Sequence, residues 1–299
     1  MQRRHFFKAS GAGVGAAIAL RSTGGSAALP PAAEPPICVF TKHVQRLSFD
    51  ELAKRLQSIG VQGVEATLRK GGQIAPQALR DQLPRYVDAL SKYQQSILIA
   101  ASDVNEAGDE TERYLKELAK AQVPFFRMKY YRYNFEKPIL PQLDQFASDA
   151  TKLADLCREI GITALYQNHA GRNYCGAALW DLEKVLSEVD PDALGVAVDI
   201  RHTSLELSQS YEAGFRMIKP RMRATYVKDF DWFEGKAQNV PLGEGRSKPL
   251  FELIQKTGFV GPLSLHMEYT DHRDASTTEA SWDAIAKDAA TLKGWLGEN

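Results

Sequence analysis

Short apolar runs alternate with amphipathic stretches along the chain, beginning near residue 37. The apolar runs are rich in β-branched and aromatic residues, which is typical of strands that are buried on both faces. The stretches between them repeat apolar residues at intervals of three and four, which is typical of helices with one buried face. Eight runs are predicted as strands: Ile37–Thr41, Gln62–Ala66, Ile97–Ala101, Phe125–Lys129, Thr163–Gln167, Gly195–Asp199, Ala224–Lys228 and Pro262–Glu268.

Two of the amphipathic stretches carry helix-start signals. Ser48 and Glu51 form a capping box, in which the serine side chain accepts a hydrogen bond from a backbone N–H of the first turn. Gly60 is placed where this helix should end. Asp109 with Glu112 repeats the start signal, so Asp109 is predicted to cap a second helix.

The spacing of these elements predicts the fold. The strands start about 25 to 40 residues apart, which is the size of a βα unit. Eight such units in roughly 260 residues favour an α/β fold of the (β/α)8 TIM barrel type. An open doubly wound sheet is the main alternative, but it usually carries a glycine-rich turn after its first strand, and residues 40–43 (Phe-Thr-Lys-His) are not such a turn. We expect one barrel domain over residues 29–299.

The first 28 residues have the pattern of an export signal. Arg3 and Arg4 are followed by Phe-Phe-Lys, by an uncharged run of small residues at 9–20, and by Ser-Ala-Ala at 26–28. This order is typical of a twin-arginine signal peptide, while a basic N-terminus with a disordered linker is the alternative. We expect a protein exported by the twin-arginine route to the periplasm or the outside of the cell.

Charge and composition narrow the classes of function. The chain has 37 basic and 37 acidic residues; residues 1–28 hold four of the basic ones and no acid, so the remainder has 33 basic residues and a net charge of −4. A mildly acidic protein is not expected to bind nucleic acid, and no later apolar run is long enough to span a membrane. Three cysteines, Cys38, Cys157 and Cys175, argue against a disulfide scaffold; Cys38 and Cys157 are expected in the core.

Histidines and inward-facing polar residues gather at the predicted strand ends, where the active groups of TIM barrels lie. The five histidines after residue 28 all fall at or near these ends: His43, His169, His202, His266 and His272. Strand alternation adds further inward polar positions: Glu65, Arg127, Lys129, Gln167, Asp199, Tyr226, Lys228, Ser264 and Glu268. Burying so many polar groups is costly unless they are paired or ligate a metal. Glu65 has a salt bridge across the barrel as the alternative to a functional role. Each histidine has a structural hydrogen bond as its alternative.

Asp199 and His202 are the clearest candidates for a metal site. A carboxylate that ends a strand and an imidazole three residues later can reach the same ion, and Glu268 lies on a nearby strand. Lys228 leaves alternatives open: it replaces a metal as the electrophile, stands beside one, or forms an ion pair with Asp199 or Glu268.

The order of five short motifs resembles the sugar phosphate isomerase/epimerase family, within the xylose isomerase-like TIM barrel superfamily, and especially an exported branch of it. The motifs are Tyr-Gln-Asn-His-Ala-Gly at 166–171, Asp-Ile-Arg-His at 199–202, Lys-Asp-Phe at 228–230, Pro-Leu-Gly-Glu-Gly at 241–245 and His-Met-Glu-Tyr at 266–269. The resemblance spans nearly all of the chain after the signal.

This resemblance implies a divalent metal at the barrel mouth, held by a Glu, an Asp, a His and a Glu from strands five to eight. Asp199 and Glu268 match that pattern, whereas Gln167 stands where the first Glu is expected and Tyr226 where the His usually falls. A glutamine carbonyl and His202 would then complete the set. The expected ligands are therefore Asp199, His202, Glu268 and Gln167, binding Mn²⁺, Mg²⁺ or Zn²⁺.

The resemblance also implies a small-molecule sugar substrate and a set of catalytic groups. We expect Glu268 to act as the base and Lys228, His169 or His202 as the acid, because Gln167 cannot accept a proton. Arg127 and Lys129 are expected to orient hydroxyls or an anionic group. The expected substrate-binding residues are Gln167, Arg127, Lys129, His43, Glu65, Tyr226 and His266.

Three functions fit these residues. The first is a sugar isomerase or epimerase that acts through an enediolate. The second is a lyase or hydrolase that cleaves 3-keto-glycosides with the same groups. The third is a non-catalytic sugar-binding barrel whose metal site has degenerated at Gln167 and Tyr226. A metal-dependent endonuclease fits poorly, because the charge is wrong for DNA.

Overall fold

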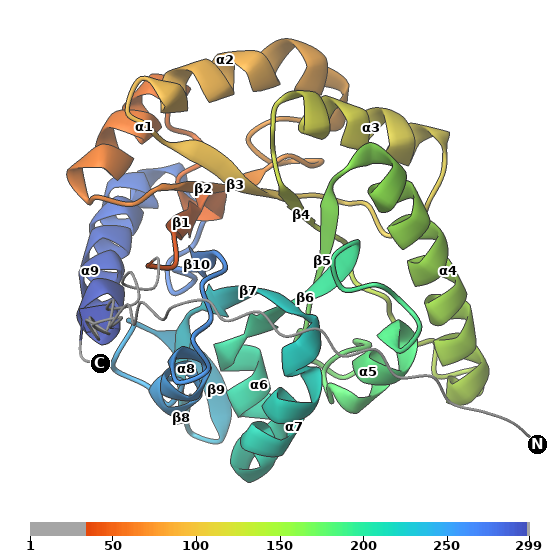
Figure 1. Ribbon diagram of the computed structural model, residues 1–299. Helices are drawn as coiled ribbons and strands as arrows, with labels where there is room; N and C mark the ends of the chain where they lie inside the picture. The colour runs from red at the N-terminus through yellow and green to blue at the C-terminus, as the bar shows by residue number, and fades with distance from the viewer. Residues whose placement is uncertain (1–33, 298–299) are drawn as a thin grey trace, which may run out of the picture. The chain divides into compact units, whose positions relative to one another are not determined.

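The computed structural model describes residues 34–297. In that range eight parallel strands close into a barrel in the order β1-β10-β7-β6-β5-β4-β3-β2 (Figure 1). The predicted TIM barrel is therefore confirmed, and all eight strands lie where the apolar runs placed them. The barrel strands are β1 (Ile37–Phe40), β2 (Gly63–Thr67), β3 (Ser96–Ala101), β4 (Phe125–Arg127), β5 (Thr163–Gln167), β6 (Leu194–Asp199), β7 (Met222–Val227) and β10 (Leu263–Leu265).

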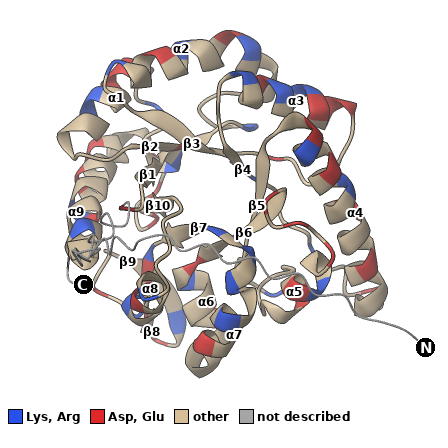
Figure 2. Cartoon of the chain, in the orientation of Figure 1, with Lys and Arg blue, Asp and Glu red and all other residues tan. Residues whose placement is uncertain are grey.

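Helices surround the barrel (Figure 1), and most of the charged residues coloured in Figure 2 lie on these helices rather than on the barrel strands. They are α1 (Phe49–Ser58), α2 (Leu79–Ser91), α3 (Asp109–Lys120), α4 (Ile139–Ile160), α5 (Trp180–Leu186), α6 (Ile200–Leu207), α7 (Tyr211–Ile218), α8 (Lys248–Gln255) and α9 (Thr278–Gly297). Short 3-10 turns cover Thr41–His43, Pro76–Ala78, Ser208–Ser210, Lys219–Arg221 and Ala275–Thr277.

The two predicted helix starts have different outcomes. Ser48 caps α1 as predicted, because its hydroxyl accepts a hydrogen bond from the backbone N–H of Glu51 at 3.2 Å. The cap predicted at Asp109 is wrong: Gly108 holds the cap position of α3, and no side chain bonds to the first turn there. Asp109 is instead the first helical residue, where a carboxylate favours the positive end of the helix dipole.

Four barrel strands end earlier than predicted. β1 stops at Phe40, β4 at Arg127, β7 at Val227 and β10 at Leu265. Their last predicted polar residues therefore lie just beyond the carboxyl ends of the strands, at the rim of the barrel. This is the location from which side chains can meet a ligand.

A β-hairpin that the sequence reading did not predict extends from the end of β7. Its strands β8 (Asp229–Phe233) and β9 (Lys236–Val240) pair antiparallel. Glu234 and Gly235 connect them with φ angles of 49° and 75°. Positive φ at both central residues of a two-residue loop matches the twist of a hairpin, and Gly235 adopts that conformation without steric cost.

The apolar core has two layers. The larger one packs the helices against the outside of the strands. The smaller one comes from strands alone and fills the barrel interior; its members are Cys38, Ile99, Leu165, Ala197, Ala224 and Tyr226. Cys38 and Cys157 are buried and unpaired, as predicted, and so is Cys175.

The predicted export signal, residues 1–28, lies outside the described residues. Between residues 34 and 297, no helix combines the length and the apolar character that a membrane span requires.

Candidate active site

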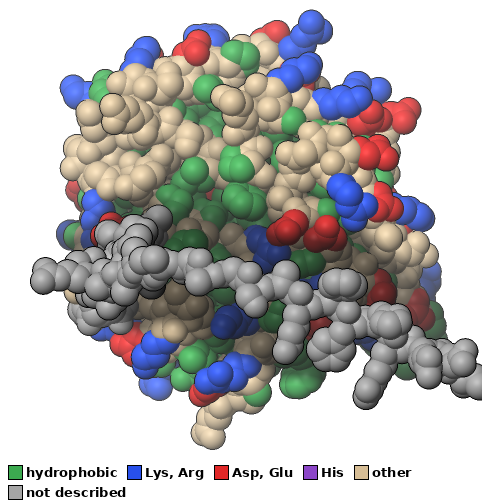
Figure 3. Space-filling model, viewed as in Figure 1, with side chains coloured by type: hydrophobic (Ala, Val, Ile, Leu, Met, Phe, Trp, Pro, Cys, Tyr) green, Lys and Arg blue, Asp and Glu red, His purple; other side chains and the backbone are tan. Residues whose placement is uncertain are grey.

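Charged side chains from three neighbouring strands meet at the carboxyl rim of the barrel. The ammonium Nζ of Lys228, just after β7, lies 2.8 Å from Oε2 of Glu268 and 3.1 Å from Oδ2 of Asp199. The side chains of Lys228 and Asp199 are 4% and 0% exposed, whereas that of Glu268 is 19% exposed. The ion pair foreseen as an alternative for Lys228 is therefore present, and it joins the ammonium to both carboxylates. On the face of the molecule drawn in Figure 3, Lys, Arg, Asp and Glu side chains lie mostly around the edge.

Glu268 and Lys228 each stabilise the charged form of the other. Burial alone would raise the pKa of Glu268, but Lys228, His266 and Lys42 outweigh it and hold that pKa well below its usual range. Burial would likewise lower the pKa of Lys228, but Asp199 and Glu268 raise it. Glu268 is thus ionised and Lys228 charged at neutral pH, so Lys228 acts as a cation and not as an amine nucleophile.

Gln167 is held from both sides. Its Nε2 donates to Oδ2 of Asp199 at 2.7 Å, and its Oε1 accepts from Nη1 of Arg127 at 3.1 Å and from the hydroxyl of Tyr130. The carbonyl that was expected to ligate a metal is therefore already used. Tyr130 was not foreseen by the sequence reading, because it lies in the loop after β4, beyond any periodic pattern.

Glu65 forms the salt bridge across the barrel that the sequence left open. Its Oε1 accepts from Nε of Arg127 at 2.7 Å, and its Oε2 contacts Ser264 at 2.6 Å and His266 at 2.7 Å. Burial would raise the pKa of Glu65, but Arg127 and His266 lower it to about 2. Both carboxylate oxygens of Glu65 are therefore paired in a buried cluster below the rim.

Some residues that were expected to touch substrate belong to this buried cluster instead. Glu65, Tyr226 and His266 are buried, and the rings of Tyr226 and His266 stack at 4.5 Å. They position Arg127 and close the barrel rather than reach a ligand. Lys129 is exposed, and within residues 34–297 no hydrogen bond or ion pair joins its side chain to the cluster.

Two histidines lie beside Lys228. Nδ1 of His202 is 3.1 Å from Nη1 of Arg201; because arginine only donates, Nδ1 accepts and the imidazole proton is on Nε2. Nδ1 of His169 contacts the carbonyl of Ala170 at 2.7 Å and therefore donates. Burial, and then Lys228, lower both pKa values, that of His169 to about 4 and that of His202 well below its usual range.

Both imidazoles are therefore neutral at pH 7. The acid role expected for His169 or His202 is not supported, because neither holds the extra proton. His202 instead presents a buried Nε2–H without a hydrogen-bond partner, 3.7 Å from Oδ2 of Asp199.

Lys42 and His43 complete the rim on the side of β1. Nζ of Lys42 lies 3.3 Å from Oε1 of Glu268, and Nε2 of His43 lies 3.2 Å from the carbonyl of Thr270. His43 is buried and holds the loop after β10 rather than a ligand. Lys42 was missed as a site residue although it follows a strand end, which was the signal that would have found it.

The residues at the rim do not fit the divalent metal that the family pattern implied. The Lys228 ammonium occupies the space between Asp199 and Glu268, so a cation there would meet a fixed positive charge. Nε2 of His202 carries a proton and cannot ligate. In the described part of the chain, no group of three His, Cys, Asp or Glu side chains is placed to hold an ion. The predicted ligand set of Asp199, His202, Glu268 and Gln167 is therefore corrected to a hydrogen-bonded cluster around Lys228.

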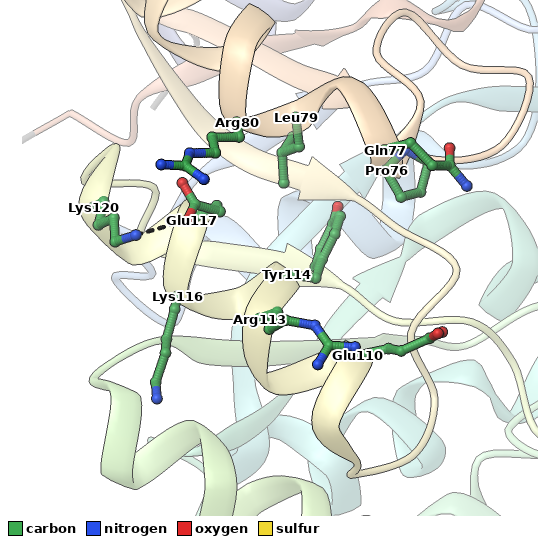
Figure 4. A pocket seen from close by; sticks show the side chains of 10 residues that line it. All are labelled: Pro76, Gln77, Leu79, Arg80, Glu110, Arg113, Tyr114, Lys116, Glu117 and Lys120. Carbon is green, nitrogen blue, oxygen red and sulfur yellow. Dashed lines mark hydrogen bonds and ion pairs between the residues drawn. The ribbon is translucent and has the colours of Figure 1, made fainter.

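A separate groove of about 530 Å³ lies on the outside of the barrel, between α2 and α3 (Figure 4). Charged and polar residues line it, among them Arg80, Glu110 and Lys116. It contains none of the rim residues, so it is distinct from the site described above.

These features define a class: a TIM barrel with a buried, charged cluster at its carboxyl rim. The sequence profile described as xylose isomerase-like TIM barrel matches residues 53–291. The chain belongs to that family, which confirms the superfamily resemblance; the exported branch stays a prediction. No curated protein sequence matches the chain.

Several solved structures share the fold. An enzyme from Bacillus anthracis assigned as a 3-DHS dehydratase of petrobactin synthesis is 15% identical, with a TM-score of 0.66, over 87% of this chain and 98% of its own. The 3-keto-D-glucoside 4-epimerase from E. coli is 14% identical, with a TM-score of 0.64, over 86% and 100%. A xylose isomerase-like TIM barrel protein from Mycobacterium smegmatis in complex with magnesium is 13% identical, with a TM-score of 0.62, over 87% and 96%.

Proposed function

We propose that the protein is a sugar isomerase that moves a proton next to a carbonyl through an enediolate, with Glu268 as base and Lys228 as electrophile. The observation that carries this proposal is the contact between the Lys228 ammonium and Glu268, the only carboxylate of the cluster that is partly exposed. The family and the sugar epimerase of similar fold support a sugar substrate.

The proposed reaction uses one base on one face of the substrate. Glu268 takes the proton from the carbon next to the carbonyl, and the electron pair of that C–H bond moves onto the carbonyl oxygen. The Lys228 ammonium, held charged by Asp199, stabilises the negative oxygen. Glu268 then returns the proton to the neighbouring carbon, while Lys228 passes a proton between the two oxygens. Gln167 cannot serve as the second base that a two-base epimerase needs, which favours isomerisation.

The proposal replaces the metal by an ammonium. A fixed positive charge at the developing oxyanion supplies electrostatic stabilisation in a site with little water. We therefore expect turnover without a divalent ion, in contrast to the metal dependence that the family pattern implied.

One experiment tests the reaction and its two rivals. Chelator-treated protein is incubated with neutral and acidic ketoses and with 3-keto-glycosides in D₂O, and the products are followed by NMR. Deuterium at carbon without loss of a bond supports the isomerase. Release of an aglycone replaces it with the lyase, which would use Glu268 for a β-elimination. Binding of sugars without any exchange overturns both and supports the non-catalytic barrel.

We also propose export by the twin-arginine route, on the basis of Arg3 and Arg4. Replacing both arginines by lysine should leave the precursor inside the cell in a fractionation experiment. Export of that variant at the normal rate would contradict the proposal.

A further inference from the structure

Three carboxylates at the rim each contact a cation. Asp199 and Glu268 face Lys228 and Lys42, and Glu65 faces Arg127. Arg69, which follows β2 at the same rim, has no such partner. Within residues 34–297, no hydrogen bond or ion pair engages its guanidinium, although its backbone carbonyl accepts from Gly72.

Arg69 and Arg127 converge on one aromatic ring. The Cζ atoms of Arg69 and Arg127 lie 5.9 Å and 4.9 Å from the centroid of the Phe40 ring. Arg69 is half-buried, and its pKa is lowered first by burial and then by the charge of Arg127. Of these two guanidinium groups only that of Arg127 is in contact with a carboxylate, so a further anion near Arg69 would be favourable.

Arg127 keeps one donor free. Its Nε and Nη1 bind Glu65, Tyr130 and Gln167, whereas its Nη2 is buried and has no partner. The residue as a whole is only 6% exposed. A buried N–H group without an acceptor is rare in proteins, and a bound ligand or ion is one way in which it gains an acceptor. The guanidinium of Arg127 thus binds Glu65 and still has one nitrogen, Nη2, without an acceptor. The guanidinium of Arg69 lies by the same Phe40 ring.

We propose that Arg69 and Arg127 bind an oxyanion group of the substrate, a carboxylate or a phosphate, so that the substrate is an acidic sugar. Guanidinium forks match such groups in shape and charge, and Phe40 supplies an apolar floor. This inference rests on the proposed function, because it assigns the substrate class for the same rim.

A chain of polar contacts connects the subsite to the reacting groups. Arg127 donates to Gln167, Gln167 donates to Asp199, and Asp199 contacts Lys228, at 3.1, 2.7 and 3.1 Å. Three contacts therefore separate the free guanidinium donor from the ammonium. The same network therefore links the donor that would hold the anionic group to the ammonium proposed to act at the carbonyl.

Binding measurements test the inference without relying on turnover. We would titrate the protein by calorimetry with D-glucuronate, D-fructose 6-phosphate and D-fructose. The variant is Arg69→Gln, with Arg69→Lys as the conservative replacement. Arg80→Gln is the matched control, because Arg80 is an exposed arginine on α2 that lies outside the rim.

We expect an anionic probe to bind and D-fructose to bind at least tenfold more weakly. Arg69→Gln should weaken the binding of the anion about tenfold to a hundredfold, as expected for a lost charge-assisted contact, whereas Arg80→Gln should not. Arg69→Lys should fall between them, because it keeps the charge without the fork. The tighter of the two anions assigns the group as carboxylate or phosphate.

Three results would overturn the inference: no binding of either anion to the wild-type protein, equal binding of D-fructose, or equal effects of Arg69→Gln and Arg80→Gln. Deuterium exchange, measured beside anion binding, separates this inference from the proposed function. If Arg69-dependent anion binding is present but no substrate exchanges deuterium, the isomerase falls and the anion subsite stands. If only neutral ketoses are turned over, the anion subsite falls and the isomerase stands.

Discussion

At the scale of single residues, Lys228 determines the character of the site. Its ammonium is buried between Asp199 and Glu268 and contacts both carboxylates. Removing one member of such a buried group leaves the others without a counter-charge, and that is costly. The cluster is thus best examined by substitutions that change its charge in defined steps.

Lys228→Met should create an affinity for Mn²⁺. The change removes the positive charge and leaves two buried carboxylates that repel each other, so a divalent ion relieves the repulsion. Titration calorimetry should show binding at least tenfold tighter than in the wild type, and Mn²⁺ should raise the melting temperature of the variant alone. Lys228→Arg keeps the charge and serves as the control. Equal Mn²⁺ affinity in wild type and Lys228→Met would mean that the ammonium does not occupy a cation site.

Glu268→Gln should abolish turnover while the protein stays folded. The amide cannot accept a proton, and loss of a general base typically costs about 10²- to 10⁴-fold in rate. The rate of solvent deuterium exchange into the substrate measures this effect, and circular dichroism checks the fold. Glu279→Gln, an exposed change on α9, is the control. Retained exchange in Glu268→Gln would remove this residue from the mechanism.

Residue periodicity predicted the inward positions well and the loop positions poorly. Alternation along the strands placed Glu65 and Asp199 inside the barrel, where both lie. It could not place Tyr130 or Arg69, because they follow strand ends in loops whose path depends on tertiary contacts. It could not decide whether Glu65 meets substrate or forms a salt bridge across the barrel; in the structure Glu65 on β2 pairs with Arg127 on β4.

At the scale of elements, local signals succeeded where the backbone chemistry is self-contained. Each strand needs only a short apolar run, and Ser48 supplies its own hydrogen bond to the first turn of α1. The hairpin of β8 and β9 was missed although Gly235 between two alternating runs is a hairpin signal. Its strands are partly exposed and mix apolar with polar residues, so they do not resemble the buried barrel strands.

Ser48→Ala should destabilise the protein by about 1 kcal/mol. The change leaves the backbone N–H of Glu51 without its side-chain acceptor, and loss of a helix cap costs on the order of 0.5–2 kcal/mol. Urea unfolding measures the difference. Ser58→Ala is the control, because the Ser58 hydroxyl bonds to the carbonyl of Arg55 near the other end of α1 and caps no N–H. Equal stability of Ser48→Ala and wild type would show that the cap contributes nothing.

At the scale of the whole molecule, buried titratable groups make stability depend on pH. The pKa of His43 is lowered from 6.5 to about 4, first by burial and then by Lys42. The pKa of His169 is lowered to about 4, and that of Glu65 to about 2. In each case the unfolded chain binds protons at a higher pH than the folded one, so acid favours unfolding.

The free energy of unfolding should therefore fall in two stages as the pH decreases. The histidines lower it between about pH 6.5 and pH 4, and Glu65 lowers it further between about pH 4.5 and pH 2. His43, 5% exposed, accounts for up to about 3 kcal/mol of the first stage. Urea unfolding at pH 7.5, 6, 5 and 4 measures the slope, and His43→Gln should reduce it. An unchanged slope in that variant would exclude His43 as a contributor.

The closed order of the strands joins the two ends of the described chain. β1 pairs with β10, and Glu65 bonds to His266, 201 residues later. During synthesis, one edge of β1 can pair with β2 early, whereas its other edge and the free edge of β7 are covered only after β10 has been made. The contact between Glu65 and His266 also forms only then, although Arg127 can pair with Glu65 earlier. A nascent chain released before β10 would expose the open edges of β1 and β7, so premature termination should yield degradation or aggregation rather than a smaller working protein.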